Sequence, residues 1–521
     1  MPLPNETVIS NSENLLILEE MSYNIEEMKE EHAKLYPSLT DEQRMVYKTI
    51  MTAVDKGEGG FFFLYGYGGT GKTYIWNTLC SAIRGRGDIV LPVASSGIAS
   101  LLLPRGRTAH SRFGIPLDCH ENSTCNKINP DNDLAGLLEK TKLIIWDEAP
   151  MTHRYCFEAL DRSLRDIMRS PDRSGKPFGG LVVVLGGDFR QILPVIPKGS
   201  RHDIVHASIS SSQLWNSCQV LKLTKNMRLQ ANASGSDAEE TKEFAEWILK
   251  IGDGTAGHSL GDGESVVALS EDILIRDATN PIAAIVENTY NDVMNNAFDP
   301  EMFKNRAILA PTNEMVDTIN DYVMSLMSTK ERVYLSSDSI CKEDGQVDLD
   351  EQVFSVEYLN TIKCSGLPSH EIKLKEGCII MLLRNIDPSN ELCNGTRLIV
   401  TQLGERVIEG KLISGKNSGK KFPIARMIMS PSDFAKFPIR FQRRQFPVSV
   451  CFAMTINKSQ GQSLSNVGLY LPKPVFSHGQ LYVAISRVTR KRGLKILVCN
   501  ESGHTQDTTT NVVYDEIFDR L

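Results

Sequence analysis

Short, uninterrupted apolar runs alternate with helix-like stretches along most of the chain. In the first half they lie at residues 60–66, 88–95, 142–148 and 181–188. A second set lies at residues 306–313, 446–455, 466–472 and 494–500. A strand of a parallel sheet is covered on both faces, so its apolar residues run continuously instead of alternating. The pattern therefore predicts an α/β protein with two doubly wound parallel-sheet lobes.

Residues 331–445 have a different pattern of apolar and polar residues. Apolar segments at 376–384, 396–403, 406–414 and 420–429 follow one another closely, separated by Gly, Asn and Pro turns. Closely spaced strands without helices between them are typical of a small all-β unit. We therefore predict a small, SH3-like β-barrel inserted into the second lobe.

These patterns divide the chain into four parts. The parts are an N-terminal extension (1–38), a first lobe (39–222) with a small insertion (about 104–135), a second lobe (223–330 and 446–521) and the β-rich insertion (331–445). Residues 1–40 carry eight Glu against two Lys. We expect the extension to be a solvated acidic arm with some helix.

Charge is distributed unevenly along the chain. The net charge of the 521 residues is -7, but residues 401–500 contain 17 Lys and Arg against 3 Asp and Glu, a net +14. A local basic block of this kind is typical of a polyanion-binding surface, and a solvated basic face is the alternative. No run of about 18 apolar residues occurs, so no membrane span is expected. The N-terminus lacks the pattern of a signal or transit peptide, so we expect a nuclear protein, with the mitochondrion as the alternative.

The eleven cysteines are scattered and form no C-x-x-C pair. Cys119 and Cys125 flank His120, but the four ligands of a zinc site at finger-like spacing are missing. Reduced, mostly buried thiols are therefore expected.

A glycine cluster follows the first apolar run. Residues 66–73, GYGGTGKT, match the P-loop pattern G-x-x-x-x-G-K-[ST] between a predicted strand and a predicted helix. Glycines let successive backbone N–H groups turn inward, and the helix N-terminus adds its positive end, so that together they bind an anion. We predict that Lys72 reaches the β- and γ-phosphates and that Thr73 ligates Mg²⁺. The predicted nucleotide-binding residues here are Gly66, Gly68, Gly69, Thr70, Gly71, Lys72 and Thr73.

Two further strand ends carry groups suited to phosphate chemistry. The strand at 142–148 ends in Asp147 and Glu148. Asp147 is suited to hold the magnesium shell, and Glu148 to take a proton from the attacking water. The strand at 181–188 opens into a loop with Gln191, whose amide can sense the γ-phosphate. A helix-capping amide is the alternative for Gln191.

Eight ordered segments resemble the superfamily 1 DNA helicases, and more closely the Pif-type (petite integration frequency) family, especially helicases of plant rolling-circle transposons and their relatives. Besides the three segments above they are LTDEQRMVY (39–47), ASSGIASLLLPRGRTAHSRFGIP (94–116), LTKNMRL (223–229), TINKSQGQSL (455–464) and LYVAISRVTR (481–490). The resemblance covers about residues 38–500 and implies RecA-like lobes. One departure is Trp146, because the family usually has a small or aliphatic residue before its acidic motif.

The resemblance implies roles for further residues. Gln43 matches the glutamine that recognises adenine. Arg228 and Arg487 match two arginines that the second lobe contributes to the transition state, where they neutralise charge on the transferred phosphoryl group. Because the P-loop lies in the first lobe, the complete catalytic site would form only when the lobes close. The implied strand-contacting residues, through phosphate contact or base stacking, are Ser96, His110, Phe113, Lys458, Ser459 and Gln460. A core aromatic is the alternative for Phe113.

Residues 436–446, KFPIRFQRRQF, interleave basic and aromatic side chains, which suits the binding of a single strand. The residues concerned are Lys436, Arg440, Arg443 and Arg444 with Phe437, Phe441 and Phe446. An ordinary barrel edge with solvated arginines is the alternative.

The resemblance implies an ATP- and Mg²⁺-dependent DNA helicase that translocates on single strands in the 5′ to 3′ direction. The family's tasks are DNA repair, recombination and telomere maintenance. The expected partners are single-stranded DNA and tailed or structured duplexes, and a monomer is expected. The alternatives are a RecD-like or RNA helicase, an inactive DNA-binding subunit of a transposition complex, and a nucleotide switch that binds a protein partner.

Overall fold

The computed structural model describes residues 14–168, 175–227, 236–276, 279–290, 303–341, 354–364, 366–431, 440–500 and 502–521. The chain forms two compact units. The first unit comprises Met1–Phe189, Leu193–Ala231 and Glu516–Leu521, and the second comprises Arg190–Ile192 and Asn232–Asp515. Within the described ranges, no helix combines the length and the apolar character that a membrane span requires.

These units correct two predicted boundaries. The first unit continues past residue 222, because Leu223 N donates to Tyr65 O at 2.9 Å and Met227 N to Gly69 O at 2.9 Å. The last six residues belong to the first unit and not to the second lobe: Trp215 Nε1 donates to Arg520 O at 3.2 Å. Hydrogen bonds between distant segments mark both boundaries, and hydrophobic periodicity carries no information about them.

The first unit contains a six-stranded sheet with the order β3-β2-β4-β5-β1-β6, in which every pairing is parallel. The four central strands are β1 (Gly60–Tyr65), β2 (Ile89–Ala94), β4 (Thr141–Asp147) and β5 (Val182–Gly187), which confirms the four predicted strands. The sequence pattern missed the two edge strands, β3 (Arg107–Thr108) and β6 (Gln219–Lys222). Both are short and lack a continuous apolar run.

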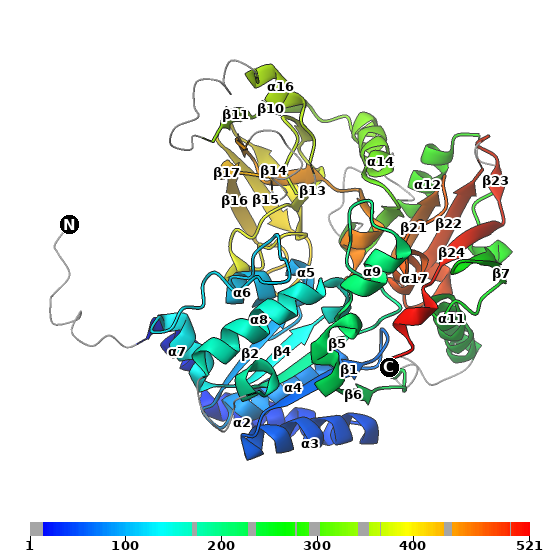
Figure 1. Ribbon diagram of the computed structural model, residues 1–521. Helices are drawn as coiled ribbons and strands as arrows, with labels where there is room; N and C mark the ends of the chain where they lie inside the picture. The colour runs from blue at the N-terminus through cyan, green and yellow to red at the C-terminus, as the bar shows by residue number, and fades with distance from the viewer. Residues whose placement is uncertain are drawn as a thin grey trace, which may run out of the picture. The chain divides into compact units, whose positions relative to one another are not determined.

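Helices cover both faces of this sheet (Figure 1). Helices α3 (Asp41–Lys56) and α4 (Lys72–Arg84) share one core with Leu143 and Ile145 of β4. On the opposite face the ring of Trp146 lies 4.5 Å from that of Phe157 on α8 (Arg154–Ile167), centroid to centroid. Its indole N–H donates to Ser95 Oγ at 3.0 Å. The bulky residue before Asp147 is therefore fully accommodated.

From residue 14 on, where the structure describes it, the N-terminal extension is not a solvated arm, which corrects the prediction. Helices α1 (Leu15–Met21) and α2 (Ile25–Leu35) are part of the first unit, and α2 packs against α4. Glu20 of α1 is buried and forms an ion pair with buried Arg112. Removing one partner of a buried pair costs about 3–5 kcal/mol, whereas an exposed pair contributes up to about 1 kcal/mol. The acidic composition of the extension gave no sign of such a buried contact.

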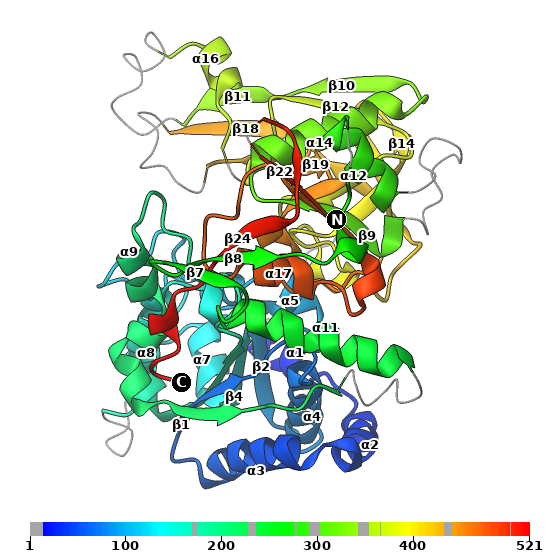
Figure 2. The same cartoon turned by 90° about the vertical axis from the view of Figure 1, so that its right-hand side faces the viewer.

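The second unit contains a five-stranded sheet with the order β20-β9-β21-β22-β23. Figure 2 labels β9 and β22 of this sheet. Its strands are β9 (Arg306–Ala310), β20 (Ala453–Thr455), β21 (Asn466–Leu471), β22 (Leu494–Cys499) and the antiparallel edge strand β23 (Thr505–Gln506). The flanking helices include α11 (Ser236–Gly252), α12 (Pro281–Thr289), α14 (Asn313–Leu326) and α17 (Gln480–Ser486). A separate three-stranded sheet joins β24 (Thr508–Val512), β8 (Glu264–Ala268) and β7 (His258–Gly261).

The predicted strand at 446–455 is two strands that belong to different sheets. Its first part, β19 (Val448–Val450), pairs with β13 of the insertion, and its second part is β20 of the lobe sheet. Asn320 Oδ1 accepts hydrogen bonds from Phe452 N at 2.9 Å and Ala453 N at 2.8 Å, at the point where the chain changes sheets. A continuous apolar run cannot reveal this change, because both halves are buried.

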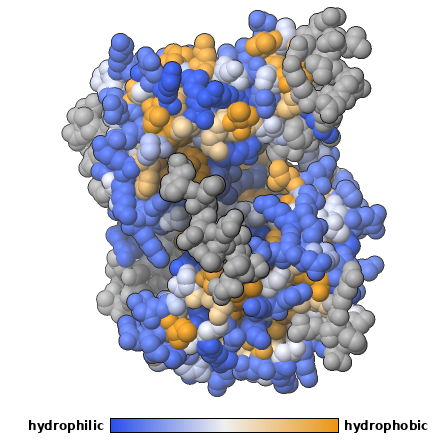
Figure 3. All heavy atoms as spheres, turned by 90° about the vertical axis from the view of Figure 1, so that its left-hand side faces the viewer, coloured by the Kyte–Doolittle hydropathy of each residue, from blue (hydrophilic) through white to orange (hydrophobic). Residues whose placement is uncertain are grey.

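In its described residues the insertion consists of strands and turns, apart from the short helix α16 (Val356–Thr361) and the 3-10 helix Pro388–Asn390. Its largest sheet has the order β16-β15-β14-β13-β19 and includes β13 (Ile379–Leu382), β14 (Arg397–Leu403), β15 (Val407–Leu412) and β16 (Lys421–Ala425). Two smaller sheets contain β11 (Ser337–Ile340), β18 (Phe441–Gln445) and β17 (Met427–Met429), and β10 (Glu331–Leu335) with β12 (Glu371–Lys375). The antiparallel strands confirm a β-rich insertion, and closure into an SH3-like barrel stays a prediction. Figure 3 shows one face of the molecule, where hydrophilic side chains predominate.

Candidate nucleotide site and strand-contacting segments

The P-loop joins the end of β1 to the start of α4. Gly71 is the N-cap of α4 with φ 87°, and Gly69 has φ 100°, which is the left-handed region that favours glycine. A Cβ atom at Gly71 would collide with the side-chain amide of Gln43. Gly66 N donates to Gly187 O at 3.2 Å, so the loop begins beside the end of β5. The loop therefore has the backbone that an anion-binding turn before a helix requires.

Lys72 and Asp147 form the charged centre of this site. Lys72 Nζ donates to Gly66 O, a carbonyl of the P-loop itself. Asp147 ends β4 and is buried. Burial raises the pKa of Asp147, and the ammonium of Lys72 opposes this rise. One cation, Lys72, and one carboxylate, Asp147, therefore lie close together at the P-loop.

The residues present fit a magnesium ion. Asp147 Oδ1 is buried and has no hydrogen-bond partner in the part of the chain that the structure describes. A Cβ at Gly186 would collide with the Trp76 ring and would lie 3.0 Å from this oxygen, so only glycine fits beside Asp147 on β5. Carboxylate and hydroxyl oxygens are the donors that Mg²⁺ prefers, and the waters that it keeps would satisfy this oxygen. Thr73 and Asp147 are therefore the residues that would hold the ion.

Glu148 has a backbone conformation that is unusual for its residue type. Its φ of 53° and ψ of 38° place it in the left-handed region, at the N-cap of the 3-10 helix Ala149–Met151. A residue other than glycine pays about 1 kcal/mol or more for this conformation, and such residues cluster at functional sites. The turn therefore begins directly after Asp147, at the end of β4, and the role of Glu148 as a general base stays a prediction.

Gln43 links α3 to the P-loop. Its Nε2 donates to Thr70 O at 3.0 Å, and its Oε1 accepts from Thr40 N at 3.0 Å in a capping box. The structure therefore places Gln43 beside the P-loop, with its side-chain amide bonded to backbone groups. Its role in adenine recognition stays a prediction.

Glu42 is a site residue that the sequence analysis missed. Its carboxylate accepts hydrogen bonds from Thr224 N at 3.0 Å, Thr224 Oγ1 at 2.5 Å and Lys225 N at 3.3 Å. Burial acts to raise the pKa of Glu42, but these hydrogen bonds from Thr224 and Lys225 outweigh it and lower the pKa. Only its position beside Gln43 could have drawn attention to it.

Glu42 fixes the segment that leads to Arg228. Tyr67 Oη donates to Thr224 O at 2.6 Å, and Met227 N donates to Gly69 O, so residues 223–227 run along the P-loop within the first unit. The prediction that this stretch belongs to the second lobe is therefore wrong. Arg228 itself lies outside the described residues, and its catalytic role stays a prediction.

Gln191 and Arg487 both belong to the second unit. Gln191 is buried, and its Oε1 lacks a hydrogen-bond partner in the described ranges. Gly479, the N-cap of α17 with φ 74°, packs against this loop: a Cβ there would lie 2.7 Å from the carbonyl carbon of Gln191. Arg487 is the C-cap of the same helix. One short helix therefore connects the two predicted residues.

The Arg487 side chain is held by hydrogen bonds within the second unit. Its Nε donates to Val483 O at 2.9 Å, Nη1 to Gln462 O at 3.0 Å and Nη2 to Ser486 Oγ at 3.0 Å. The Gln462 carbonyl belongs to the turn that follows the predicted strand-contacting residues Lys458, Ser459 and Gln460. The guanidinium and this turn therefore form one hydrogen-bonded structure.

The six predicted strand-contacting residues differ in exposure. Lys458 is exposed and lines a hollow of about 460 Å³ together with residues of α14 and the insertion. Ser459 and Gln460 are buried, and the Ser459 hydroxyl donates to Ile456 O at 2.7 Å. In this structure Lys458 is the residue of the three that a strand can reach.

In the first unit, Ser96 is half-buried and caps α5 (Gly97–Leu101), accepting from Ala99 N at 3.2 Å. His110 is half-buried and contacts Cys156, and burial lowers its pKa. Phe113 is fully buried against Trp146 and cannot stack on a base. Its proposed stacking role is therefore corrected: the aromatic completes the core on this face of the sheet.

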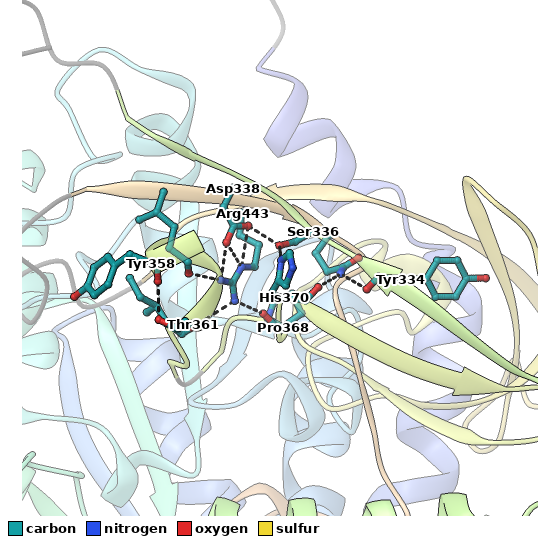
Figure 4. A network of polar contacts seen from close by, with 11 residues as sticks. Tyr334, Ser336, Asp338, Tyr358, Thr361, Pro368, His370 and Arg443 are labelled. Carbon is teal, nitrogen blue, oxygen red and sulfur yellow. Dashed lines mark hydrogen bonds and ion pairs between the residues drawn. The ribbon is translucent and has the colours of Figure 1, made fainter. Parts of the chain in front are cut away.

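The structure describes residues 440–446 of the interleaved segment. Arg440 and Arg444 are exposed, so their binding role stays a prediction, but Arg443 belongs to an internal polar network (Figure 4). Arg443 is buried and forms a bidentate ion pair with Asp338, with 2.7 Å between Nη2 and Oδ2. Its Nη groups also donate to the carbonyl oxygens of Leu359, Ile362 and Pro368. Phe441 and Phe446 are fully buried. Lys436 and Phe437 lie outside the described residues.

Ser336 and His370 extend this network. Ser336 Oγ donates to Asp338 Oδ1 at 2.6 Å and lies 2.8 Å from His370 Nδ1. Strand β18 therefore buries alternate residues, Phe441, Arg443 and Gln445, inside the insertion. Arg444, which lies between Arg443 and Gln445, is exposed.

Comparisons with known proteins agree with this geometry. Residues 38–260 match the family described as PIF1-like helicase, and residues 357–403 match the 2B domain of the DNA helicase Pif1. The chain is 26% identical over 486 residues to the ATP-dependent DNA helicase Pif1 of Psychrobacter sp. (strain PRwf-1), which covers 84% of this chain and 66% of that protein. It is 26% identical over 522 residues to the ATP-dependent DNA helicase RRM3 of Saccharomyces cerevisiae, covering 91% of this chain and 67% of the relative.

Solved structures show the same fold. The Pif1 helicase of Candida albicans superposes with a TM-score of 0.61 at 22% identity, covering 92% of this chain and 98% of that one. A Pif1 helicase solved in a study of unwinding at forked double-stranded DNA by two coordinating helicases also has a TM-score of 0.61, at 23% identity, covering 88% of this chain and 92% of that one. The two parallel sheets are therefore those of a two-lobe, RecA-like helicase fold. With the P-loop, the Asp147–Glu148 strand end and the matched 2B segment, these similarities show that the chain belongs to the PIF1-like helicase family.

Proposed function

We propose that the protein is an ATP- and Mg²⁺-dependent DNA helicase that translocates on single-stranded DNA in the 5′ to 3′ direction. The observation that supports the proposal is the site in the first unit, where Lys72 and Asp147 lie together at the P-loop and Glu148 directly follows Asp147. A switch protein would need the P-loop but not the exposed Lys458 or the two lobes of a motor. Its tasks would be those of its relatives, namely repair, recombination or telomere maintenance in the nucleus.

The protein's own residues would divide the work as follows. The P-loop amides and Lys72 bind and orient the phosphates, Gln43 fixes the loop to α3, and Glu148 takes a proton from the attacking water. Bound at Thr73 and Asp147, a magnesium ion would neutralise phosphate charge. We propose that Arg228 and Arg487 add guanidinium groups at the transition state, which would couple hydrolysis to movement of the lobes.

The proposal is tested by ATP hydrolysis with and without single-stranded DNA, and by unwinding of duplexes with a 5′ or a 3′ tail. We expect DNA to stimulate hydrolysis and the 5′-tailed duplex to be unwound. Lys72→Ala should reduce turnover by about 100-fold or more while DNA binding remains, because it removes the charge that holds the phosphates. Lys48→Ala, an exposed lysine on α3, is the matched control.

Three results would contradict the proposal. Equal hydrolysis with and without nucleic acid would indicate a switch. Stimulation by RNA but not by DNA would indicate an RNA motor. DNA binding without measurable hydrolysis would indicate a binding subunit of a larger complex.

A further inference from the structure

The segment that precedes residue 38 touches the part of the first unit that we assign to DNA. The family similarity begins at residue 38, so α1 and α2 lie outside it. Yet α1 reaches residues 105–112, which contain β3 and most of α6 (Ala109–Phe113). These residues follow Ser96 along the chain and include His110.

Three contacts join the two segments, and they differ in burial. Glu20 pairs with Arg112 of α6, and both side chains are almost completely buried. Glu19 pairs with Arg107 of β3 at 3.1 Å, but this pair is exposed, with 51% and 37% of the side chains accessible. Arg105 Nη1 donates to Glu19 O and Ser22 Oγ, each at 3.0 Å.

Tyr23 adds a fourth contact from the turn between α1 and α2. Its ring lies between two guanidinium groups, with the Arg84 carbon 4.0 Å and the Arg105 carbon 4.1 Å from the ring centroid. Arg84 is the last residue of α4, the helix that begins at the P-loop. Tyr23 therefore connects the far end of the P-loop helix to the segment 105–112.

These contacts could either block the basic segment or hold it in place. Blocking requires that a DNA phosphate displace the acidic residues. That exchange is easy for the exposed Glu19 but not for Glu20, since release of Arg112 would leave a carboxylate buried without a partner. The contact therefore acts as a permanent support for the segment.

The support reaches the predicted strand-contacting residues through the sheet. Arg112 and His110 share α6, and α6 follows β3 directly. Strand β3 pairs with the end of β2, where Arg107 is opposite Val93 and Thr108 is opposite Ala94. Ser96 lies two residues beyond Ala94. A shift of α6 would therefore move both His110 and the edge strand beside Ser96.

We propose that Glu20 and Tyr23 are positioning residues for single-strand binding, which hold β3 and α6 in the geometry that grips DNA. This inference rests on the proposed function, because it assigns the segment to DNA. It makes residues 14–23 part of the motor although they lie outside the family similarity.

The test compares Glu20→Gln, Tyr23→Leu and Glu26→Gln in the full chain. Glu26 is exposed on α2, where it pairs with Lys29, so its variant is the control for loss of one negative charge. Binding of a fluorescent oligothymidine is measured together with hydrolysis of ATP without DNA. We expect the Kd for DNA to rise about tenfold or more in Glu20→Gln and Tyr23→Leu, because the segment loses its buried partner. DNA-free hydrolysis in all three variants and DNA binding of the control should stay within about twofold of the wild type.

Hydrogen exchange supplies a readout that needs no DNA. We expect faster exchange of the amides of residues 105–113 in Glu20→Gln, with unchanged exchange in the P-loop, and partial recovery in Glu20→Asp. Unchanged exchange at 105–113 would overturn the positioning role. Tighter DNA binding by Glu20→Gln would also overturn it, because it would mean that α1 blocks the segment. Equal losses of DNA binding and of DNA-free hydrolysis would overturn it as well. If the wild-type protein failed to bind DNA, the proposed function would be contradicted. Hydrogen exchange at residues 105–113 would then still show whether Glu20 supports this segment.

Discussion

At the residue scale, Arg443 stabilises the β-rich insertion, whereas the sequence predicted that it binds single-stranded DNA. The planar guanidinium group of an arginine has five N–H donors, so it can bind two carboxylate oxygens and several carbonyl oxygens at once. Arg443 uses it on Asp338 and on the carbonyl oxygens of Leu359, Ile362 and Pro368. A solvated arginine on DNA would have none of these partners inside its own domain.

Replacing Arg443 tests this role. Arg443→Lys keeps the charge but loses the fork, so we expect the insertion to lose about 3 kcal/mol of stability, seen as a lower midpoint in thermal unfolding and faster proteolysis of residues 331–445. Arg444→Lys, at the neighbouring exposed position, should change neither. Weaker DNA binding by Arg443→Lys with unchanged stability would restore the DNA-contact hypothesis.

At the scale of elements, α17 joins two predicted catalytic residues. Its N-cap, Gly479, lies against the loop of Gln191, and its C-cap is Arg487, whose guanidinium bonds to the turn after Lys458. A displacement of the Gln191 loop would be transmitted along two turns of rigid helix. The helix is thus suited to link nucleotide sensing with strand contact.

Gly479 is the position at which this link can be tested. Gly479→Ala would place a methyl group against the backbone of Arg190 and Gln191 and force alanine into a left-handed conformation. We expect a loss of about 1–3 kcal/mol in stability and a reduced stimulation of ATP hydrolysis by DNA. Gly503→Ala has a similar φ of 79° but no atom within 4 Å, so it controls for backbone strain. Equal behaviour of the two variants would show that contact with the Gln191 loop has no role.

At the scale of the whole molecule, the predicted catalytic groups are divided between two compact units. The P-loop, Asp147 and Glu148 belong to the first unit, and Gln191 and Arg487 to the second. Gln191 belongs to the second unit although it follows β5 of the first, so the chain connects the units at this point. Such a division is what a motor driven by relative movement of two lobes would use.

Arg487 provides the test of this division. Arg487→Ala should leave ATP binding within about threefold of the wild type but reduce turnover by about a thousandfold or more, because a transition-state guanidinium contributes that much to phosphoryl transfer. Arg487→Lys should not restore turnover, because an ammonium lacks the planar fork. Turnover and binding are measured separately, by single-turnover hydrolysis and by a fluorescent nucleotide analogue, with Arg490→Lys as the control. Normal turnover in Arg487→Ala would remove this residue from the catalytic site.

The sequence by itself determined the central strands of both sheets and the P-loop. Buried parallel strands need continuous apolar runs, and a phosphate-binding turn needs glycines at fixed spacing, so both leave a local record. The sequence also indicated Asp147, Glu148 and Lys72, because their chemistry follows from their places at strand ends and at a helix start.

Only the tertiary structure decided which polar residues are buried and by what they are paired. Glu20 meets Arg112 and Asp338 meets Arg443 across about a hundred residues of sequence, separations of 92 and 105 positions. Nothing local distinguishes these acidic residues from solvated ones, nor Phe113 from an aromatic that stacks on a base. The same holds for Glu42, whose partners Thr224 and Lys225 lie far along the chain. Pairing energy depends on burial, and burial is set by the packing of the whole unit.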